Sequence, residues 1–356
     1  MSLRNLLRIG LAPRLVIFAV TSHCNACCST CSFPDIPGSE RRHVEYGKAV
    51  KAIDFLAGNG VRMISLTGGE PLLHPRFLDI CRAIDDRGLV ISYIATNGIA
   101  LDDATARELA RLNVNMVGLS LDLTGNDGIG RTRRYDVDGV AGRAKEILDR
   151  HGIPCYAGVL MGRNPDDARS MLAKCERMGF TRVVVSYPQC RMGSSYRAAA
   201  DSPDTALGPD TVRDIAAAIM AEKRLRRRLS IFNTDVNLEE LARAAGGGRP
   251  AFRCPAGRWQ FYLDWDLVLY RCFNDGLRLG NVLELGGLEF TCGGCPGCTQ
   301  QAYLDYASYY RAIEILGELG NCLRGGGGGK LGRILFDREN RRALRSVVET
   351  YLGGFV

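Results

Sequence analysis

Short runs of β-branched and other apolar residues alternate with segments of helical period from residue 14 to residue 188. In the helical segments Leu, Ile and Ala recur three and four residues apart, and several glycines stand where helices would stop. This alternation predicts a parallel sheet covered by helices, either open or curled into a partial barrel, because neighbouring parallel strands need a crossover helix. The six strand candidates are RLVIFAVTS, RMISLTGG, VISYIATNG, MVGLSLD, PCYAGVLMG and RVVVSYP.

Five helical segments lie between these strands, and a sixth, PDTVRDIAAAIMAEKRLRRR, follows a polar linker at about residues 196–208. The alternation stops at the glycine-rich stretch AAGGGRP, which ends at Pro250. Beyond it the pattern changes to a cysteine-rich one. We therefore predict two domains, a β/α domain over residues 1–228 and a smaller domain over residues 229–356.

The smaller domain should contain a β-hairpin and helices. RWQFYLDWDLVLYRC predicts a hairpin that turns near Asp264–Asp266, and helical patterns run from about Tyr303 to Leu319 and from about Arg338 to Leu352. The run Gly325–Gly329 stands before Lys330, but the flanking residues are not those of a phosphate-binding loop. We predict a flexible linker there.

Composition limits the classes of function. The chain is 46% hydrophobic and 24% charged, and no apolar run approaches the roughly 20 residues needed to span a bilayer. We expect a cytoplasmic protein with at most peripheral membrane contact, because the leucines among the first 14 residues can equally cap the bottom of a barrel. The basic run Lys223–Arg228 is typical of a solvated helix face, and we do not expect nucleic-acid binding.

Fourteen cysteines and only four histidines point to thiolate chemistry. A cytoplasmic chain of this length is kept reduced and needs no disulfide framework, so ligation is the favoured use of the cysteines. Few histidines leave little material for a mixed Cys/His zinc site or a histidine-based hydrolase.

Four of the cysteines fall within eight residues of the stretch VTSHCNACCSTCSF, just after the first strand. Adjacent Cys27 and Cys28 rarely bind one zinc ion together, and a bacterial ferredoxin run would need cysteine at position 30, which is Thr. The remaining set, Cys24, Cys28 and Cys31, has the spacing C-x3-C-x2-C. It offers three thiolates to a four-iron cluster and leaves one iron open. We predict that Cys27 is a small buried residue.

The sequence resembles the radical S-adenosylmethionine (SAM) enzymes at this motif and at three further strand ends. LTGGEPLLHP follows the second strand, ATNG the third, and SLD ends the fourth. The resemblance implies a partial (β/α)6 TIM-like barrel, with a [4Fe-4S] cluster on the three cysteines whose open iron binds S-adenosylmethionine. It assigns cofactor contacts to Gly68, Gly69, Glu70, Thr96, Asn97, Ser120 and Asp122. Thr30 replaces the aromatic residue common before the third cysteine, and Phe33 is expected to take over its contact with adenine.

The second cysteine group resembles the SPASM or twitch extension of that family, which implies an auxiliary [4Fe-4S] cluster. Cys254 and Cys272 flank the hairpin, and a C-x2-C repeat follows. The same cysteine pattern is sufficient for a zinc ribbon, which is the alternative interpretation. A glycine usual in the hairpin turn is Leu267 here, and the cysteine series is short, which favours a twitch-like single cluster. Two further ligands of this cluster must come from Cys292, Cys295, Cys298 and Cys322. We favour Cys292 and Cys295. Cys81, Cys155, Cys175 and Cys190 are predicted to be packing residues.

The resemblance implies an enzyme that cleaves S-adenosylmethionine to a 5′-deoxyadenosyl radical and removes hydrogen from an unactivated C–H bond. We expect a small biosynthetic metabolite of sugar, cyclitol or lipid type as substrate, a net oxidation, and a reductase such as flavodoxin or ferredoxin as partner. About a dozen residues precede the first strand, which favours a small molecule over a peptide. The alternatives are a peptide-modifying enzyme, or a radical epimerase with Cys27 or Cys190 as hydrogen donor. A non-enzymatic iron–sulfur or zinc protein is the alternative from another class.

Overall fold

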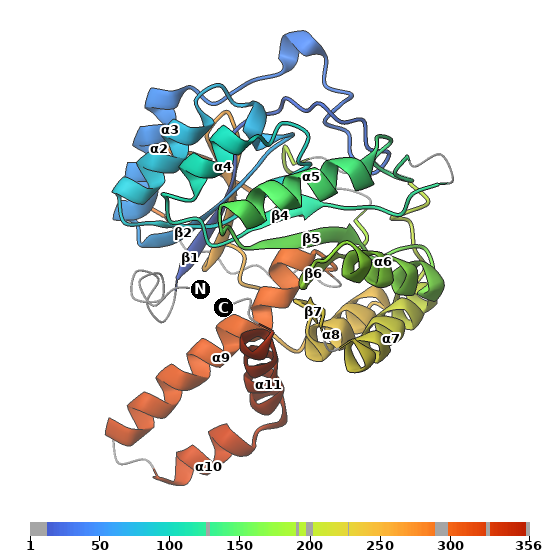
Figure 1. The fold of residues 1–356 in the computed structure, drawn as a ribbon. Helices are drawn as coiled ribbons and strands as arrows, with labels where there is room; N and C mark the ends of the chain where they lie inside the picture. The colour runs from blue at the N-terminus through green and yellow to red at the C-terminus, as the bar shows by residue number, and fades with distance from the viewer. Residues whose placement is uncertain are drawn as a thin grey trace.

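A computed structural model of the chain describes residues 13–125, 129–189, 192–196, 202–226, 228–288, 298–324 and 328–353. Its strands form one sheet in the order β10-β9-β8-β1-β2-β3-β4-β5-β6-β7 (Figure 1). The strands are β1 (Arg14–Ala19), β2 (Val61–Thr67), β3 (Val90–Thr96), β4 (Val117–Ser120), β5 (Cys155–Leu160), β6 (Arg182–Ser186), β7 (Ser230–Ile231), β8 (Gln260–Leu263), β9 (Val268–Tyr270) and β10 (Arg278–Asn281).

Parallel pairing runs without interruption from β8 through β1 to β7, which confirms the six predicted strands and the mixed α/β class. Helices α2 to α8 cover the outer face of this curved sheet (Figure 1). Helices α9 to α11 come after the last strand in the chain. The helices are α2 (Tyr46–Gly58), α3 (Phe77–Asp86), α4 (Asp103–Leu109), α5 (Val137–Arg150), α6 (Pro165–Arg177), α7 (Pro209–Leu225), α8 (Asp235–Ala245), α9 (Gln301–Arg324), α10 (Gly328–Phe336) and α11 (Arg338–Leu352), with short 3-10 turns η1 (Gly38–Glu40) and η2 (Pro71–Leu73).

Side-chain caps explain where several of the crossover helices begin. Glu45, Asp102, Asp136 and Asn164 each accept a hydrogen bond from a backbone N–H in the first turn of the helix that follows. Such caps satisfy donors that the helix itself cannot, which is typically worth about 1 kcal/mol each. All six predicted helical segments are present, and they bury their Ala, Ile and Leu positions against the sheet.

The β/α alternation continues past residue 228, where we placed the domain boundary. Strand β7 pairs with β6, and α8 packs beside α7. The predicted hairpin is confirmed as antiparallel β8 and β9, but β8 also pairs in parallel with β1. The two predicted domains therefore share one sheet, and the boundary itself stays a prediction. The predicted linker at Gly325–Gly329 is wrong in part, because α10 begins at Gly328.

Helix α9 closes the open side of the barrel between β7 and β8. The Tyr187 hydroxyl after β6 donates to Asp305 of α9 at 2.6 Å, and the Tyr310 hydroxyl of α9 donates to the Pro13 carbonyl before β1 at 2.8 Å. Helix α10 and the far half of α9 project from the barrel as a helical arm, and α11 returns from it to pack against α8 (Figure 1).

The barrel is hollow because its inward positions near the carboxyl ends of the strands carry small residues. A cavity of about 430 Å³ lies inside it. Ala95, Ser120, Gly158 and Ser186 line this cavity from four neighbouring strands, whereas barrels of this type are ordinarily filled by large branched side chains. We call this cavity the hollow. Its lining reaches from the loop after β1 to the α9 and α11 side chains Tyr309 and Thr350.

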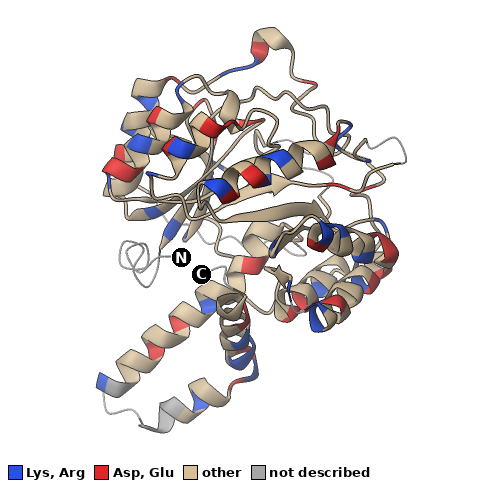
Figure 2. Ribbon diagram, viewed as in Figure 1, with Lys and Arg blue, Asp and Glu red and all other residues tan. Residues whose placement is uncertain are grey.

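Two members of the basic run Lys223–Arg228 pair with acidic side chains of other helices, whereas Arg224 and Arg228 are exposed, as predicted. Lys223 pairs with Asp235 of α8 and Glu349 of α11, and Arg226 pairs with Glu176 of α6. Figure 2 shows acidic and basic residues interspersed along α6 to α8. No helix among the described residues is long and apolar enough to cross a membrane. The leucine-rich segment before Pro13 lies outside those residues.

Candidate functional site

Cys24, Cys28 and Cys31 all line the hollow at the carboxyl end of β1. Two bonds hold their loop in place, since the Ser29 N–H donates to the Thr132 carbonyl at 2.7 Å and the Asn97 side chain donates to Asn25 at 2.8 Å. Burial raises the pKa of all three thiols, that of Cys31 to about 12, so a bound metal would have to stabilise their thiolates.

The glycines of the GGE motif let the second strand end pass directly against this cysteine loop. A Cβ on Gly68, whose φ is +142°, would lie 2.3 Å from the Thr21 carbonyl, and one on Gly69 would lie 2.3 Å from the His23 carbonyl and 3.1 Å from the Cys24 Cβ. Both approaches exclude a larger residue. The hollow, the three thiols and the close glycine backbone together fit a [4Fe-4S] cluster with a small organic ligand beside it. No three His, Cys, Asp or Glu side chains of the described residues are placed for a single metal ion.

Glu70 is buried at the edge of the hollow, and the donors to it among the described residues are neutral. Its Oε1 accepts from the Thr96 hydroxyl at 2.7 Å and the Leu72 N–H at 3.2 Å, and its Oε2 accepts from the Asn97 N–H at 2.7 Å. Burial raises the pKa of Glu70 to about 7, although these three donors act in the opposite direction. The carboxylate therefore starts the turn η2, as a cap does, and also joins the ends of β2 and β3.

The other predicted cofactor residues, with the exception of Asp122, also line the hollow. Thr96 ends β3 and Asn97 follows it, and Ser120 ends β4. Phe33 is buried, with its ring edge-on to Tyr196 at a centroid distance of 5.7 Å. Its contact with adenine stays a prediction.

Asp122 turns its carboxylate away from the hollow, towards the loop that follows β4. Its Oδ2 accepts from the Thr132 hydroxyl at 2.8 Å, from the Thr132 N–H and from the Arg133 N–H at 3.0 Å, and its Oδ1 accepts from the Leu123 N–H at 2.9 Å. The structure therefore gives this carboxylate a positioning role in the loop. Its predicted contact with ribose remains untested.

Arg133 lines the hollow beside Cys28 and was missed in the sequence. Burial opposes its charge, but Cys28, Tyr135 and Asp122 raise the pKa of Arg133 above its ordinary value, so it is a half-buried cation. Its Nε donates to the Leu121 carbonyl at 3.4 Å. The chain carries many exposed arginines, and only the residue's position after the SLD motif could have singled it out.

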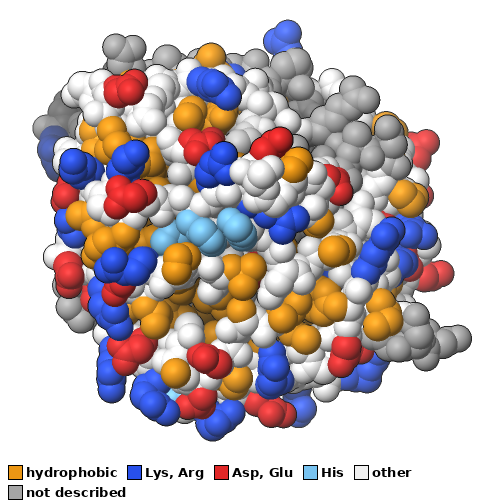
Figure 3. Space-filling model, turned by 90° about the horizontal axis from the view of Figure 1, so that it is seen from above, with side chains coloured by type: hydrophobic (Ala, Val, Ile, Leu, Met, Phe, Trp, Pro, Cys, Tyr) orange, Lys and Arg blue, Asp and Glu red, His pale blue; other side chains and the backbone are white. Residues whose placement is uncertain are grey.

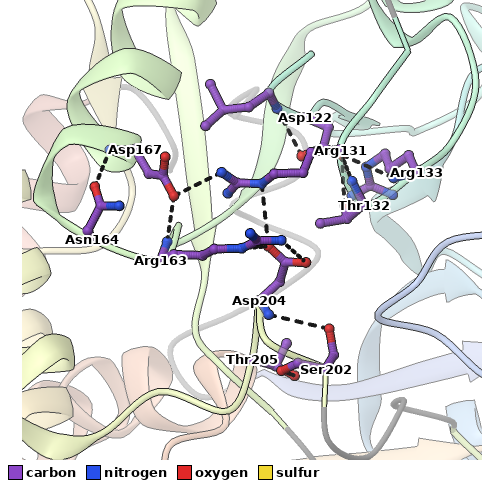
Figure 4. A network of polar contacts seen from close by, with 11 residues as sticks. Asp122, Arg131, Thr132, Arg133, Arg163, Asn164, Asp167, Ser202, Asp204 and Thr205 are labelled. Atoms are coloured by element: carbon purple, nitrogen blue, oxygen red, sulfur yellow. Dashed lines mark hydrogen bonds and ion pairs between the residues drawn. The ribbon is translucent and has the colours of Figure 1, made fainter. Parts of the chain in front are cut away.

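Two arginines and two aspartates tie together the loops around the hollow (Figure 4). Asp204, whose side chain is 5% exposed, accepts two bonds from Arg163, at 2.6 and 3.1 Å, and pairs with Arg131 at 3.4 Å. Arg131 also pairs with Asp167 at 2.9 Å. These contacts hold the loop carrying Arg133 against the start of α6 and against the segment before α7, whose Thr205 lines the hollow. We call this set the loop-tie network.

Three imidazoles stack behind the cysteine loop. The rings of His23 and His43 are parallel at 4.1 Å, and His74 stands edge-on to His43 at 5.2 Å. Burial lowers the pKa of His43 to about 4, and His74 donates from Nε2 to the Val44 carbonyl at 2.8 Å. Figure 3 shows histidine side chains side by side on this face. At neutral pH His43 is uncharged.

Cys254 and Cys272 lie at one aromatic cluster, and Cys298 is linked to the loop after Cys272 through Asn274. The thiol of Cys272 accepts from the Asp275 N–H at 3.4 Å, and that of Cys298 from the Asn274 side chain at 3.6 Å. Cys254 packs against the same cluster as Cys272. This cluster contains Phe33, Tyr262, Trp265, Phe273 and Tyr303, and it also contacts Cys24 and Cys31. Cys292 and Cys295 lie outside the described residues.

Predictions for the remaining cysteines have mixed outcomes. Cys81, Cys155 and Cys175 are buried, as expected of packing residues, and Cys190 lies outside the described residues. The prediction for Cys27 is wrong, because this residue is exposed at the surface of its loop. The neighbouring Cys28 lines the hollow, and this leaves Cys27 on the outer side of the loop. Cys322 stands near the end of α9, and a rise of 1.5 Å per residue places it about 30 Å along the helix from Gln301.

Comparison with known proteins places this site in a family. Residues 18–175 match the model of the radical SAM superfamily. The chain is 40% identical over 116 residues to GTP 3′,8-cyclase of Chlorobaculum tepidum, covering 32% of this chain and 34% of that protein. It is 30% identical over 223 residues to PqqA peptide cyclase of Ruegeria pomeroyi, covering 62% of this chain and 58% of that protein. The chain thus matches less than two thirds of either relative.

Solved structures share the fold at low sequence identity. Streptococcus suis SuiB bound to S-adenosylmethionine aligns with a TM-score of 0.59 and 12% identity, over 80% of this chain and 73% of SuiB. The protein anSMEcpe with bound AdoMet aligns with a TM-score of 0.57 and 19% identity, over 77% of this chain and 78% of that one. The matched residues 18–175, which hold the cysteine loop, the paired glycines and Glu70, are those of a radical SAM domain.

Proposed function

We propose that this protein is a radical SAM enzyme in which Cys24, Cys28 and Cys31 hold the [4Fe-4S] cluster. The observation that carries the proposal is that the three thiols line one hollow with the paired glycines and Glu70 beside them. When bound, the cluster and S-adenosylmethionine supply hydrogen-atom abstraction from a C–H bond. The protein's own contribution is to orient the reactants and to exclude water.

The charges of the hollow match the charged groups of S-adenosylmethionine. Glu70 has only neutral partners, so an ammonium group would supply the missing cation. Arg133 is a half-buried cation beside Cys28, so it suits a carboxylate. Asp122 and the loop-tie network hold Arg133 in place. Glu70 and Arg133 are therefore the residues that we assign to the two ends of the methionine moiety.

The second cysteine group is proposed to hold an auxiliary [4Fe-4S] cluster. Cys254 and Cys272 lie at one aromatic cluster, and Cys298 is in contact with Asn274 in the loop after Cys272. The sulfurs of Cys272 and Cys298 accept N–H hydrogen bonds of the kind that tune such sites. Cys292 and Cys295 are the candidates for completing the set. That cluster could accept an electron from the substrate, so a net oxidation remains our prediction.

The relatives support a peptide substrate better than the small metabolite that we expected. The chain shares 30% identity with a peptide cyclase, and the solved neighbours include SuiB bound to the precursor peptide SuiA. We therefore propose peptide modification first. A small molecule is the second candidate, which the 40% identity to a GTP cyclase favours.

Iron content tests the cluster assignment. Anaerobically reconstituted protein should hold about eight irons, and the triple variant C24A/C28A/C31A about four. Cys27→Ser is the matched control, since Cys27 is exposed in the same loop and should not change the iron content. Equal iron in the triple variant and the wild type would refute the assignment. About four irons in the wild type, with zinc on the later cysteines, would refute only the auxiliary cluster.

The substrate class is tested with a low-mass extract of the host cell. If the substrate is a peptide, the extract should accelerate 5′-deoxyadenosine formation, and treatment with protease followed by removal of the protease should abolish the acceleration. Acceleration that survives the protease would favour the small-molecule candidate.

A further inference from the structure

The hollow contains one buried charge that the cofactor does not use. Among the described residues that line it, Glu70, Arg133 and Asp305 are the side chains that ordinarily carry a full charge. Glu70 and Arg133 border the cysteine loop and are assigned above to S-adenosylmethionine. Asp305 lies on α9, which closes the other side of the barrel.

Asp305 is 3% exposed, and its hydrogen-bond partners are neutral. Its Oδ1 accepts from the Tyr187 hydroxyl at 2.6 Å, and its Oδ2 accepts from the Asn233 amide at 2.8 Å and the Gln301 amide at 2.9 Å. A carboxylate has about four acceptor positions, so these three bonds leave one on Oδ1. Burying a carboxylate without a cation is costly.

The nearest cation among the described residues is engaged elsewhere. Lys223 donates to the Asn233 carbonyl at 2.7 Å and pairs with Asp235 at 3.3 Å and with Glu349, so it acts on Asp305 only from a distance. Burial raises the pKa of Asp305 to about 7 despite the three donors and Lys223. No cation of the described residues is recorded in an ion pair with Asp305.

Aromatic rings of the hollow surround the same space. Tyr156 and Tyr306 lie inside the barrel yet keep accessible surface, which faces the hollow. The ring of Tyr306 lies 5.8 Å from that of Phe232, and the ring of Tyr156 lies 6.4 Å from that of Tyr93. A carboxylate beside exposed tyrosine faces favours a cation over a neutral or anionic group.

We propose that Asp305 anchors a basic nitrogen of the substrate inside the hollow, either the ammonium of a free amine or that of a basic side chain on a peptide. The inference rests on the proposed function, since it takes the cofactor to occupy the Glu70 and Arg133 end. It gives α9 a specificity role in addition to closing the barrel.

Binding of simple amines tests the proposal. The probes are n-hexylamine and its uncharged counterpart 1-hexanol, titrated calorimetrically at pH 8 into the full chain loaded with cluster and S-adenosylmethionine. The wild type should bind the amine at least about tenfold more tightly than the alcohol, because a charge-assisted hydrogen bond is made only by the amine. In Asp305→Asn, which can keep the bonds to Tyr187, Asn233 and Gln301, this preference should disappear.

Asp264→Asn is the matched control. Asp264 is a buried aspartate of the hairpin turn that does not line the hollow, and burial raises its pKa also. This variant should keep the preference for the amine. A second pair of probes, acetylated tripeptide amides with central lysine or norleucine, distinguishes the sources: tighter binding of the lysine peptide than of hexylamine indicates a peptide-borne nitrogen, and the reverse order indicates a free amine.

Three results would overturn the proposal: no measurable binding of the amine by the wild type, equal binding of amine and alcohol, or a preference that survives in Asp305→Asn. Formation of 5′-deoxyadenosine with dithionite is followed in parallel. Asp264→Asn should retain it, because Asp264 does not line the hollow. Loss of that product in the wild type would instead refute the proposed function, while the amine titration would still report on Asp305.

Discussion

Glu70 and Asp305 are two carboxyl groups that the fold buries at the hollow with neutral partners. Each joins segments far apart in the sequence, Glu70 the ends of β2 and β3, and Asp305 helix α9 with the β6–β7 edge. Uncompensated burial of this kind raises a carboxyl pKa and is common at functional sites. The two residues therefore carry the most direct predictions at the scale of single side chains.

Replacing Glu70 by Gln should weaken S-adenosylmethionine binding by roughly tenfold to hundredfold, because a charge-assisted hydrogen bond to an ammonium is worth about 1.5–3 kcal/mol. Equilibrium dialysis with labelled cofactor measures the change. Iron content should stay the same, since Glu70 is not a cluster ligand. Unchanged cofactor affinity in this variant would leave Glu70 as only the cap of η2.

The pH dependence of stability should change in Asp305→Asn. Burial raises the pKa of Asp305 from 3.8 to about 7, so between these values the folded chain holds a proton that the unfolded chain has lost. The free energy of unfolding should therefore fall as pH rises from about 4 to about 7, and Asn should remove part of this slope. Glu70 contributes in the same direction and remains. Urea unfolding at pH 5 and pH 8 checks this, and an identical slope in both proteins would contradict it.

At the scale of elements, the strands and crossover helices follow from the sequence because their signals are local. Period, caps and glycine stops lie within each segment, and all six β/α units are where the pattern placed them. The pairing of β8 with β1 and the placement of α9 depend on contacts between residues hundreds of positions apart, such as Tyr310 with Pro13. No local period encodes such contacts.

The candidate site likewise contains some residues that a local sequence signal reveals and others that only the folded structure reveals. The sequence pattern predicts some site residues because each stands at or just after a strand end, and the ends of parallel strands meet at one edge of the sheet. These residues are Cys24, Gly68, Glu70 and Ser120. Asp305 lies within a regular helical pattern, and its role appears only once α9 closes the barrel. The prediction that Cys27 is buried is wrong because the exposure of a loop residue depends on which of its neighbours faces the hollow, and no local pattern encodes this.

The loop-tie network should control how firmly Arg133 is held. Asp204→Asn removes the charge that pairs with Arg163 and Arg131, so amides of residues 130–133 and 202–208 should exchange hydrogen faster. Asp166→Asn is the control, because Asp166 is 89% exposed and surface pairs contribute about 0–1 kcal/mol. Equal exchange in Asp204→Asn and the wild type would contradict a positioning role.

The hairpin turn provides a test of backbone strain. Leu267 has φ +61° at the position where the related domains commonly have glycine, yet its side chain is 2% exposed. Losing the buried side chain should cost about 2–5 kcal/mol, which exceeds the roughly 1–2 kcal/mol of strain that glycine would relieve. Both Leu267→Gly and Leu267→Ala should be destabilised, but Gly by about 0.5–1 kcal/mol less than Ala. Urea midpoints check the order, and a more stable Ala variant would contradict the strained turn.

At the scale of the whole molecule, the two cysteine groups belong to one continuous sheet and border the same aromatic cluster. The hairpin that carries Cys254 and Cys272 at its ends extends the barrel sheet beside β1, and α9 continues from Cys298 into the barrel wall. The hollow is thus enclosed by both parts of the chain, so substrate recognition should involve α9 as well as the strand ends.

The central claim is that this hollow binds a cluster on Cys24, Cys28 and Cys31 and cleaves S-adenosylmethionine. The most direct measurement is the anaerobic formation of 5′-deoxyadenosine by reconstituted protein with dithionite. We predict formation by the wild type and by Cys27→Ser, and none by C24A/C28A/C31A. A cluster-loaded wild type that forms no 5′-deoxyadenosine, or a triple variant that forms it at the wild-type rate, would contradict the claim.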